Sequence, residues 1–270
     1  MKLMLKVLAV LGALVLFGLP MLWMLVLALK PSATFAQDPL GIVFSPTLEH
    51  YVKVFKQGEL LRAMVNSVVV TAFSVALTIA LAAPVAFALS RYSFRGKRVF
   101  SLLLLLGLTV PVHITLLPLL KGTAMLGLSS TLFALGVVYA SFGLAITVFM
   151  LKNAFDAMPT ELLEAATLDG CSNSRAFFSI ALPVIRPTIV VAAVYNCVIN
   201  YNEFAFALTL LRTERLKTLP LFIADFSKAM GADVQAQAAA ISLAAIPVFV
   251  LFVFAQRYMI AGMTEGALKG

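Results

Sequence analysis

The chain has 270 residues, of which 62% are hydrophobic and only 12% are charged. A soluble domain carries roughly twice that share of charge, so the composition excludes an ordinary soluble enzyme and a disordered chain. The net charge of +8 does not indicate nucleic-acid binding, because basic loops beside anionic lipid give membrane proteins the same excess. Two cysteines, Cys171 and Cys197, provide neither a disulfide framework nor a paired-cysteine metal site.

Six long apolar stretches bounded by charged residues predict an all-α membrane protein with six transmembrane helices. About 20 apolar residues cross the hydrocarbon core, and a helix satisfies its backbone polar groups within the span. The expected spans are residues 7–29, 63–90, 99–120, 131–151, 188–211 and 235–256. The first run is too long for the apolar core of a signal peptide, so we expect an uncleaved anchor. We expect one transmembrane domain over residues 1–270.

The orientation follows from the linker at residues 91–98. Its sequence, RYSFRGKR, holds four basic residues in eight, and such loops stay on the cytoplasmic side. This arrangement also places both termini and residues 152–187 in the cytoplasm, with residues 30–62 and 212–236 outside. Within the first outer segment, residues 44–62 combine a Ser-Pro turn with mixed apolar and charged residues, which predicts a short surface helix.

The segment at residues 152–187 is too long for a plain connection between two spans. Pro159 suits the start of a helix, and residues 160–169 are rich in helix formers. Gly170 is placed to stop that helix, and Ser172 is placed to cap a second one that runs to about residue 182. The sequence therefore predicts a helix, a glycine turn and a helix on the cytoplasmic face.

Two interpretations of this helical pair follow from its composition. It is either a solvated connection or a docking site, and two features favour docking. Ala165 and Ala166 form a small surface that permits close approach. The segment also has more large apolar side chains than a solvated loop needs, and such patches mark partner surfaces. These side chains are Leu162, Leu163, Phe177 and Phe178.

The same segment resembles the EAA signature of bacterial ABC importer permeases, EAA-x3-G-x9-I-x-LP. Every position of the pattern is met, by Glu164, Ala165, Ala166, Gly170, Ile180, Leu182 and Pro183. The resemblance implies that this loop is a coupling helix, which sits in a cleft of a separate cytoplasmic ATPase and transmits its motion. On this resemblance we expect ATPase coupling by Glu161, Glu164, Ala165, Ala166, Asp169, Gly170, Ile180, Leu182 and Pro183.

Further elements resemble the carbohydrate-type permeases of this family, specifically the shorter six-span subunit of maltose-type importers. They are Leu29-Lys30-Pro31-Ser32, Asn66-Ser67, the linker 91–98, Tyr201-Asn202-Glu203-Phe204 and the tail 262–270. Tyr201 stands where the family usually has tryptophan. The resemblance implies a multi-pass permease in the cytoplasmic (inner) membrane that moves a mono- or oligosaccharide inward. It also implies that the tail, at residues 266–270, reaches toward the ATPases.

The partners implied by the resemblance are a second homologous permease, an ATPase dimer and an extracytoplasmic sugar-binding protein. Membrane lipid surrounds the chain, and no nucleic-acid partner is expected. We expect no cofactor in this chain, because ATP and Mg²⁺ belong to the ATPase. Gly96-Lys97-Arg98 does not complete a phosphate-binding G-x4-GK-[ST] loop, and no hydrolase motif is present, so the chain is not expected to be an enzyme.

Polar residues gather in the fifth expected span. Asn196, Asn200 and Glu203 are spaced to share one helical face, and Tyr201 and Asn202 lie beside them. Such residues are costly in lipid, so the face is expected to meet a neighbouring helix or a water-filled path. Interhelical hydrogen bonding and a sugar translocation path are both open interpretations.

Three other features of the spans are less specific. His113 lies alone in the third span and is expected to be packed rather than catalytic. Four prolines are expected to kink their spans: Pro84, Pro111, Pro118 and Pro247. Alternative functions are a permease of the same fold for another solute, such as a polyamine or phosphate, and an ion-coupled carrier. A carrier usually has paired repeats and several intramembrane acids, whereas Glu203 is the only acid in these spans.

Overall fold

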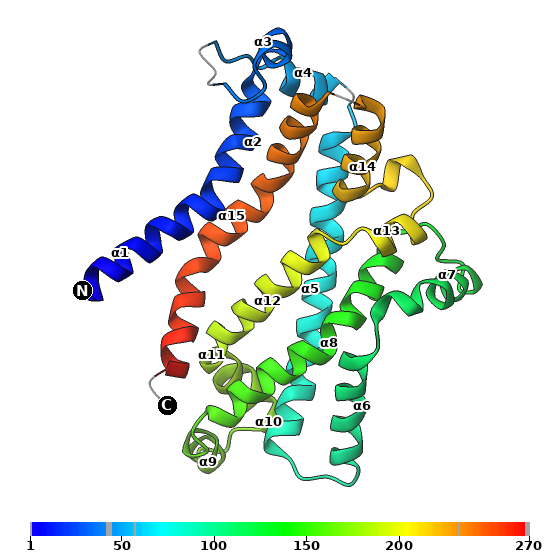
Figure 1. Ribbon diagram of the computed structural model, residues 1–270. Coiled ribbons are helices and arrows are strands. Elements are labelled where there is room, and N and C mark those ends of the chain that lie inside the picture. Colours follow the sequence, from blue (N-terminus) through cyan, green and yellow to red (C-terminus); the bar gives the residue numbers. More distant parts are fainter. Residues whose placement is uncertain (1, 42–44, 57, 232, 268–270) are drawn as a thin grey trace. The chain divides into compact units, whose positions relative to one another are not determined.

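A computed structural model describes the backbone of residues 2–41, 45–56, 58–231 and 233–267, and within these ranges the side chains of residues 4–256. Every regular element in this part of the chain is helical (Figure 1). The side chains of the tail at residues 262–270, which resembles the family's C-terminal end, lie outside the described residues.

Four helices are long and apolar enough to cross a membrane, and two bent helix pairs raise the possible number of spans to six. The four cover Met4–Leu29, Leu60–Arg91, Leu132–Ala157 and Val234–Gln256. The first comprises α1 (Lys2–Ala13), a π-helical turn η1 (Leu14–Gly18) and α2 (Leu19–Leu29); the others are α5 (Leu60–Arg91), α8 (Leu132–Ala157) and most of α15 (Val234–Ala267). The predicted all-α membrane fold is confirmed.

The third expected span, residues 99–120, is not one continuous helix. α6 (Lys97–Thr109) is followed by a 3-10 turn, η2 (Val112–Thr115), and by α7 (Leu116–Met125), with a bend of 92°. Val110 is extended at φ −74° and ψ 123°, the conformation that a following proline favours, and Pro111 has no N–H to continue the helix. The kink expected at Pro111 is therefore present as a sharp bend between α6 and the helices that follow it.

The fifth expected span, residues 188–211, is also divided. α12 (Arg186–Tyr201) ends at Asn202, and α13 (Ala205–Leu210) begins after Phe204. The Asn202 side chain donates to the Val198 carbonyl at 2.8 Å and so takes up a backbone acceptor at the end of α12. Residues 188–211 therefore form two helices rather than one, with Asn202, Glu203 and Phe204 between them.

Short helices fill the segments that were expected outside the membrane. α3 (Ser32–Gln37) and α4 (Glu49–Lys56) precede α5, and the 3-10 turn η4 (Glu214–Leu216) and α14 (Leu219–Met230) precede α15. The helix predicted within residues 44–62 is therefore confirmed as α4. In Figure 1, α3 and α4 lie at the C-terminal end of α2.

The chain divides into two compact units, one of residues 1–65 and 218–247 and the other of residues 66–217 and 248–270. In the second unit, α12 and α6 both pack along α8. The core includes Ala86, Phe87, Val148, Leu151 and Phe155, all buried. Figure 1 shows the EAA segment, α9 (Glu161–Leu168) to α11 (Leu182–Val184), at one end of α8 and α13 at the other. The EAA segment and the break between α12 and α13 therefore lie at opposite ends of this unit (Figure 1).

Candidate functional site

The EAA segment folds as two helices joined by a glycine turn. α9 is followed by Gly170 at φ +75°, a left-handed conformation that glycine adopts without a Cβ penalty. The Gly170 N–H donates to the Thr167 carbonyl at 3.0 Å, and the Cys171 N–H donates to the Ala166 carbonyl at 2.9 Å. These two bonds close a Schellman motif, so the predicted helix stop at Gly170 is confirmed.

The second helix of the segment begins at the predicted cap. Ser172 accepts a hydrogen bond from the Arg175 N–H at 3.4 Å. The helix then runs without interruption through α10 (Asn173–Ala176), a π-helical turn η3 (Phe177–Ala181) and α11, ending at Val184. The two helices touch each other, so together they form one compact element rather than a flexible connection.

Aromatic packing fixes this element to the end of the helical core. The Phe177 ring lies 5.1 Å from the ring of Phe87 on α5, and 6.4 Å from that of Phe155 on α8. Phe177 is 8% exposed, whereas the adjacent Phe178 is 66% exposed. One face of the second helix is thus packed against the core of the second unit, and the other face is exposed.

The basic linker also holds the loop in place. Arg91, at the end of α5, donates to the carbonyls of Phe155 at 2.5 Å and Met158 at 2.7 Å. Ser90 donates to Asp156 at 2.6 Å. The Arg91 bonds cap carbonyls at the end of α8, where Phe155 also accepts from the Met158 N–H at 3.2 Å, and together with the Ser90 bond they fix where the chain leaves α8 toward α9.

The residues expected to couple to the ATPase divide by exposure. The exposed ones are Glu161, Glu164, Ala165, Asp169, Gly170 and Pro183, while Ile180 and Leu182 are half-buried and Ala166 is buried. Leu162 and Leu168 add exposed apolar surface to α9. Leu182 packs against the core. The segment therefore offers an open surface on α9 and a supporting surface on the second helix.

The polar residues of α12 lie in the interior of this unit. Asn196 is 2% exposed and donates to Thr147 Oγ1 on α8 at 2.9 Å and to the Ala192 carbonyl at 2.8 Å. Asn200 is 6% exposed and donates to Ser74 Oγ on α5 at 2.9 Å. Both amides therefore join α12 to its neighbours, which is the interhelical bonding that the sequence left open.

The three residues that follow differ from one another. Tyr201 is buried, Asn202 is exposed, and Glu203 is half-buried beyond the end of α12. Glu203 accepts hydrogen bonds from the Phe206 N–H at 2.9 Å, the Ala207 N–H at 3.2 Å and the Tyr139 hydroxyl at 2.7 Å. The structure thus brings Glu203 to the start of α13 and leaves Asn202 the most accessible polar group of the set.

His113 and the two cysteines have simple surroundings. The His113 ring stacks on Phe206 with centroids 5.9 Å apart. Both cysteines are free and partly buried. Within the described residues, no group of three or more His, Cys, Asp or Glu side chains is arranged to hold a metal ion.

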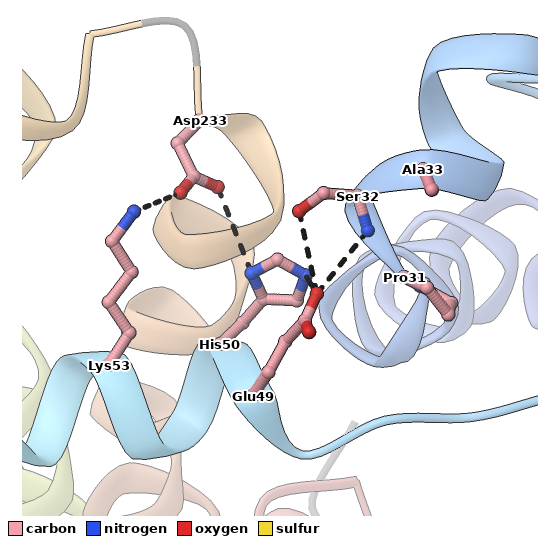
Figure 2. A pocket seen from close by; sticks show the side chains of 7 residues that line it. All are labelled: Pro31, Ser32, Ala33, Glu49, His50, Lys53 and Asp233. Carbon is pink, nitrogen blue, oxygen red and sulfur yellow. Dashed lines mark hydrogen bonds and ion pairs between the residues drawn. The ribbon is translucent and has the colours of Figure 1, made fainter.

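A polar pocket of about 370 Å³ lies in the other unit, between α3, α4 and the start of α15. Figure 2 shows the buried His50 ring between two carboxylates. Its Nε2 lies 3.2 Å from Glu49 Oε1 and 3.1 Å from the Lys30 carbonyl, and its Nδ1 lies 3.8 Å from Asp233 Oδ1. These contacts join α4 to the chain on both sides of it.

Asp233 is the most connected group in this pocket. Partial burial acts to raise the pKa of its carboxyl, but hydrogen bonds from Lys53 and the Ala236 N–H, together with the charges of Lys53 and His50, outweigh this effect. The pKa of Asp233 therefore lies below its ordinary value of 3.8. Asp233 accordingly acts as an ionised cap at the start of α15.

Residues 75–265 match the family described as the binding-protein-dependent transport system inner membrane component. The match covers well over half of the chain. The chain belongs to this family. Among its relatives, the arabinooligosaccharides transport system permease protein AraQ of Halalkalibacterium halodurans is 31% identical over 255 residues, with 93% of this chain and 91% of the relative covered. The trehalose/maltose transport system permease protein MalG of Thermococcus litoralis is 30% identical over 272 residues, covering 98% and 97%.

Solved structures of transporters share the fold of this permease. A chain from the crystal structure of a bacterial ABC transporter involved in the import of the acidic polysaccharide alginate matches with a TM-score of 0.78 at 21% identity, over 96% of both chains. A chain of the MetNI methionine ABC transporter matches with a TM-score of 0.61 at 19% identity, over 75% of this chain and 95% of that one. The fold is therefore that of ABC importer permeases.

Sequence reasoning missed the partners of the polar residues in this permease. Tyr139 binds Glu203, Ser74 binds Asn200, and Thr147 binds Asn196. A signal was present, because a carboxylate or amide inside a span requires a hydrogen-bonding partner. The choice among the many hydroxyls of the other spans, however, depends on which helices are neighbours.

Proposed function

We propose that this chain is one membrane subunit of an ATP-driven importer that moves a mono- or oligosaccharide into the cytoplasm. The observation that carries the proposal is the EAA segment, a helical pair packed against one end of the second unit, with much of α9 exposed. Its support is that relatives at 30% identity or more are named as permeases for arabinooligosaccharides and trehalose/maltose. Another relative, at 30%, is named for diacetylchitobiose uptake.

The assembly that we propose has four kinds of component. This chain pairs with a second homologous permease, two ATPases dock on the cytoplasmic side, and a sugar-binding protein delivers substrate from outside. ATP and Mg²⁺ are held by the ATPases, so this chain hydrolyses nothing itself. Solved relatives include a transporter in complex with a periplasmic protein that carries an alginate pentasaccharide, which supports a binding-protein partner.

The proposed topology is one permease domain in the cytoplasmic membrane with six spans and both termini inside. The basic linker at residues 91–98 and the EAA segment then lie on the same side of the membrane. The hydrogen bonds from Arg91 to the end of α8 support this arrangement, because they tie the linker to the start of the EAA segment. The pocket around His50 then faces outward.

Coupling is assigned to the EAA segment. Closure of the ATPases pushes on Glu161, Glu164 and Ala165 of α9, and Gly170 transmits the movement to the second helix. The other residues that we assign to coupling are Ala166, Asp169, Ile180, Leu182 and Pro183.

For the sugar path we assign Asn202 as the accessible polar contact at the break after α12, with Tyr201 and Glu203 beside it. Asn196 and Asn200 support the path by fixing α12 to α8 and α5.

A reconstitution tests the proposal. The chain is placed in liposomes with the permease, ATPase and binding protein encoded beside it, and ATP hydrolysis is measured against a panel of sugars. Gly170→Pro is the disrupting variant, because proline fixes φ near −65° whereas Gly170 requires +75°. Gly170→Asn is the matched control, since asparagine tolerates the left-handed region.

We expect one or a few sugars to stimulate hydrolysis and to be imported, and we expect Gly170→Pro, but not Gly170→Asn, to abolish the stimulation while the complex still assembles. Stimulation by a polyamine or phosphate and by no sugar would assign another substrate. Uptake by this chain alone, without ATP, would reject the importer in favour of a carrier.

A further inference from the structure

A buried tyrosine contacts the break in the fifth span. Tyr139 lies on α8 and is 1% exposed. Its hydroxyl donates to Glu203 Oε2 at 2.7 Å, a short bond to an acidic acceptor. Since its side chain is enclosed within the unit, Tyr139 cannot itself contact a solute, so its effect must pass through Glu203.

Glu203 is held from two sides. Its Oε1 accepts from the Phe206 N–H, and its Oε2 accepts from both the Ala207 N–H and the Tyr139 hydroxyl. Two of these donors belong to the first turn of α13, where backbone N–H groups have no helical partner. The third comes from α8, which fixes the direction of the carboxylate. Tyr139 therefore ties the break in the chain to a different helix.

The residues of this turn also contact the bend in the third span. Phe206 is 1% exposed, and its ring lies 4.8 Å from Phe142 on α8 and 5.9 Å from His113 on η2. The break after α12, the bend after α6 and the helix α8 therefore meet around Phe206. Phe206 is thus linked to Glu203 through its N–H and to η2 and α8 through its ring.

The exposed amide of Asn202 lies immediately before this fixed point. Asn202 Nδ2 donates to the Val198 carbonyl at 2.8 Å, which holds the side chain against the end of α12. Asn202 is therefore an exposed residue between the buried Tyr201 and the hydrogen-bonded Glu203.

We propose that Tyr139 is a positioning residue for translocation: its hydrogen bond to Glu203 sets the segment between α12 and α13 so that Asn202 faces the solute path. The proposal rests on the proposed function only for the identity of the path. The positioning itself is a property of this chain and is measured separately below.

The first experiment measures the accessibility of residue 202 without using transport. Asn202→Cys is made in a background of Cys171→Ser and Cys197→Ser, and its rate of labelling by a hydrophilic maleimide is followed in proteoliposomes of the complete complex. Tyr139→Phe removes only the hydroxyl and keeps the ring in the core. Tyr92→Phe, in the exposed linker, removes the same group away from Glu203 and is the matched control.

We expect Tyr139→Phe to change the labelling rate about tenfold, the effect of one hydrogen bond to a charged group. Tyr92→Phe should leave the rate unchanged. An unchanged rate in an assembled Tyr139→Phe complex overturns the proposal. If that variant does not assemble, the labelling rate is measured in Glu203→Gln instead, and an unchanged rate there overturns the proposal. Glutamine keeps the side-chain length and one acceptor oxygen but cannot accept all three donors.

The second experiment compares uptake with ATP hydrolysis, which separates positioning from simple loss of protein. For Tyr139→Phe we expect less sugar transported per ATP hydrolysed, with the KM for the loaded binding protein and the amount of assembled complex unchanged. The double variant Tyr139→Phe/Glu203→Gln should be no worse than Glu203→Gln alone, because both act through one contact. Additive losses, or a raised KM with normal coupling, overturn the proposal.

The outcomes distinguish this inference from the proposed function. If the wild-type complex imports no sugar while the labelling still depends on Tyr139, the substrate assignment fails and the positioning stands. If the wild type imports sugar and neither labelling nor coupling depends on Tyr139, the positioning fails and the importer stands.

Discussion

Replacing Gly143 by alanine tests how closely α12 and α8 are fitted together. A Cβ atom on Gly143 would lie 2.0 Å from Asn196 Oδ1 and 3.4 Å from Thr78 Cγ2. The first distance is impossible, so the Asn196 amide must rotate or the helices must separate. Asn196 cannot rotate freely, because its Nδ2 donates to both Thr147 and the Ala192 carbonyl. The glycine is therefore required for this interhelical contact.

The expected loss of stability has two parts. Forcing extra volume into a packed interior costs about 1–3 kcal/mol. Breaking an interhelical hydrogen bond in a membrane protein adds about 0.6 kcal/mol, and at most about 1.7 kcal/mol. We therefore expect Gly143→Ala to lower the unfolding free energy by about 2–4 kcal/mol, which corresponds to a fall in Tm of very roughly 4–12 °C.

The assay is the thermal unfolding of the purified chain in detergent, with Gly107→Ala as the matched control. Gly107 is also helical, but it has no atom within 4 Å of its Cβ position. The control should be neutral or stabilising by up to about 1 kcal/mol, because alanine is the better helix former. The double variant Gly143→Ala/Asn196→Ala should be about as stable as Asn196→Ala alone. Equal Tm values for Gly143→Ala and Gly107→Ala would refute the reasoning.

Two further predictions concern the charged side chains of Arg91 and Asp233. Arg91→Met removes the Arg91 donor from the Met158 carbonyl and from the Phe155 carbonyl, which then keeps only the Met158 N–H. It should lower the unfolding free energy by about 1–3 kcal/mol in the same thermal assay, whereas Arg95→Met, in the exposed linker, should not. Equal losses would contradict the capping role. The pKa of the Asp233 carboxyl is depressed in the folded protein. The ionised carboxylate therefore stabilises the fold fully above the unfolded pKa of about 3.8, and this contribution is lost as the pH falls through the lower folded pKa. Asp233→Asn should therefore be less stable than the wild type at neutral pH, by up to about 1 kcal/mol. The difference in Tm between the two proteins should vanish at acid pH. A Tm difference that does not depend on pH would contradict this role of Asp233.

The features that the sequence predicted well depend on local chemistry. A glycine stop at Gly170, a serine cap at Ser172 and a kink at Pro111 each follow from the conformations that one residue permits. Long apolar runs likewise indicate spans regardless of how the helices pack. Predicting these elements requires no information on which helices pack together, and the structure contains them within one or a few residues of the expected positions.

The features that the sequence did not predict depend on long-range pairing. The face drawn through Asn196, Asn200 and Glu203 assumed a continuous helix, but α12 ends at Tyr201 and Glu203 instead accepts from the first turn of α13. The role of Tyr139 could not be found from its surroundings in the chain, because Glu203 lies 64 residues away. Helix periodicity shows which residues share a face, but only the packing of α8 against α12 shows which partner that face meets.

Burial now separates two roles that looked alike in the sequence. Asn196 and Asn200 are almost fully enclosed, and each donates to a hydroxyl on a neighbouring helix, so a solute could reach them only if α12 separated from α8 or α5. Asn202 needs no such rearrangement, because it is exposed where the helix breaks. An intramembrane break has a cost in unsatisfied backbone groups, and such breaks persist where they line a cavity or are buried in protein. Here Glu203 accepts from two backbone N–H groups after the break, and Tyr139 holds the Glu203 carboxylate in place, which supports our proposal of the path at the break rather than along the polar face of α12.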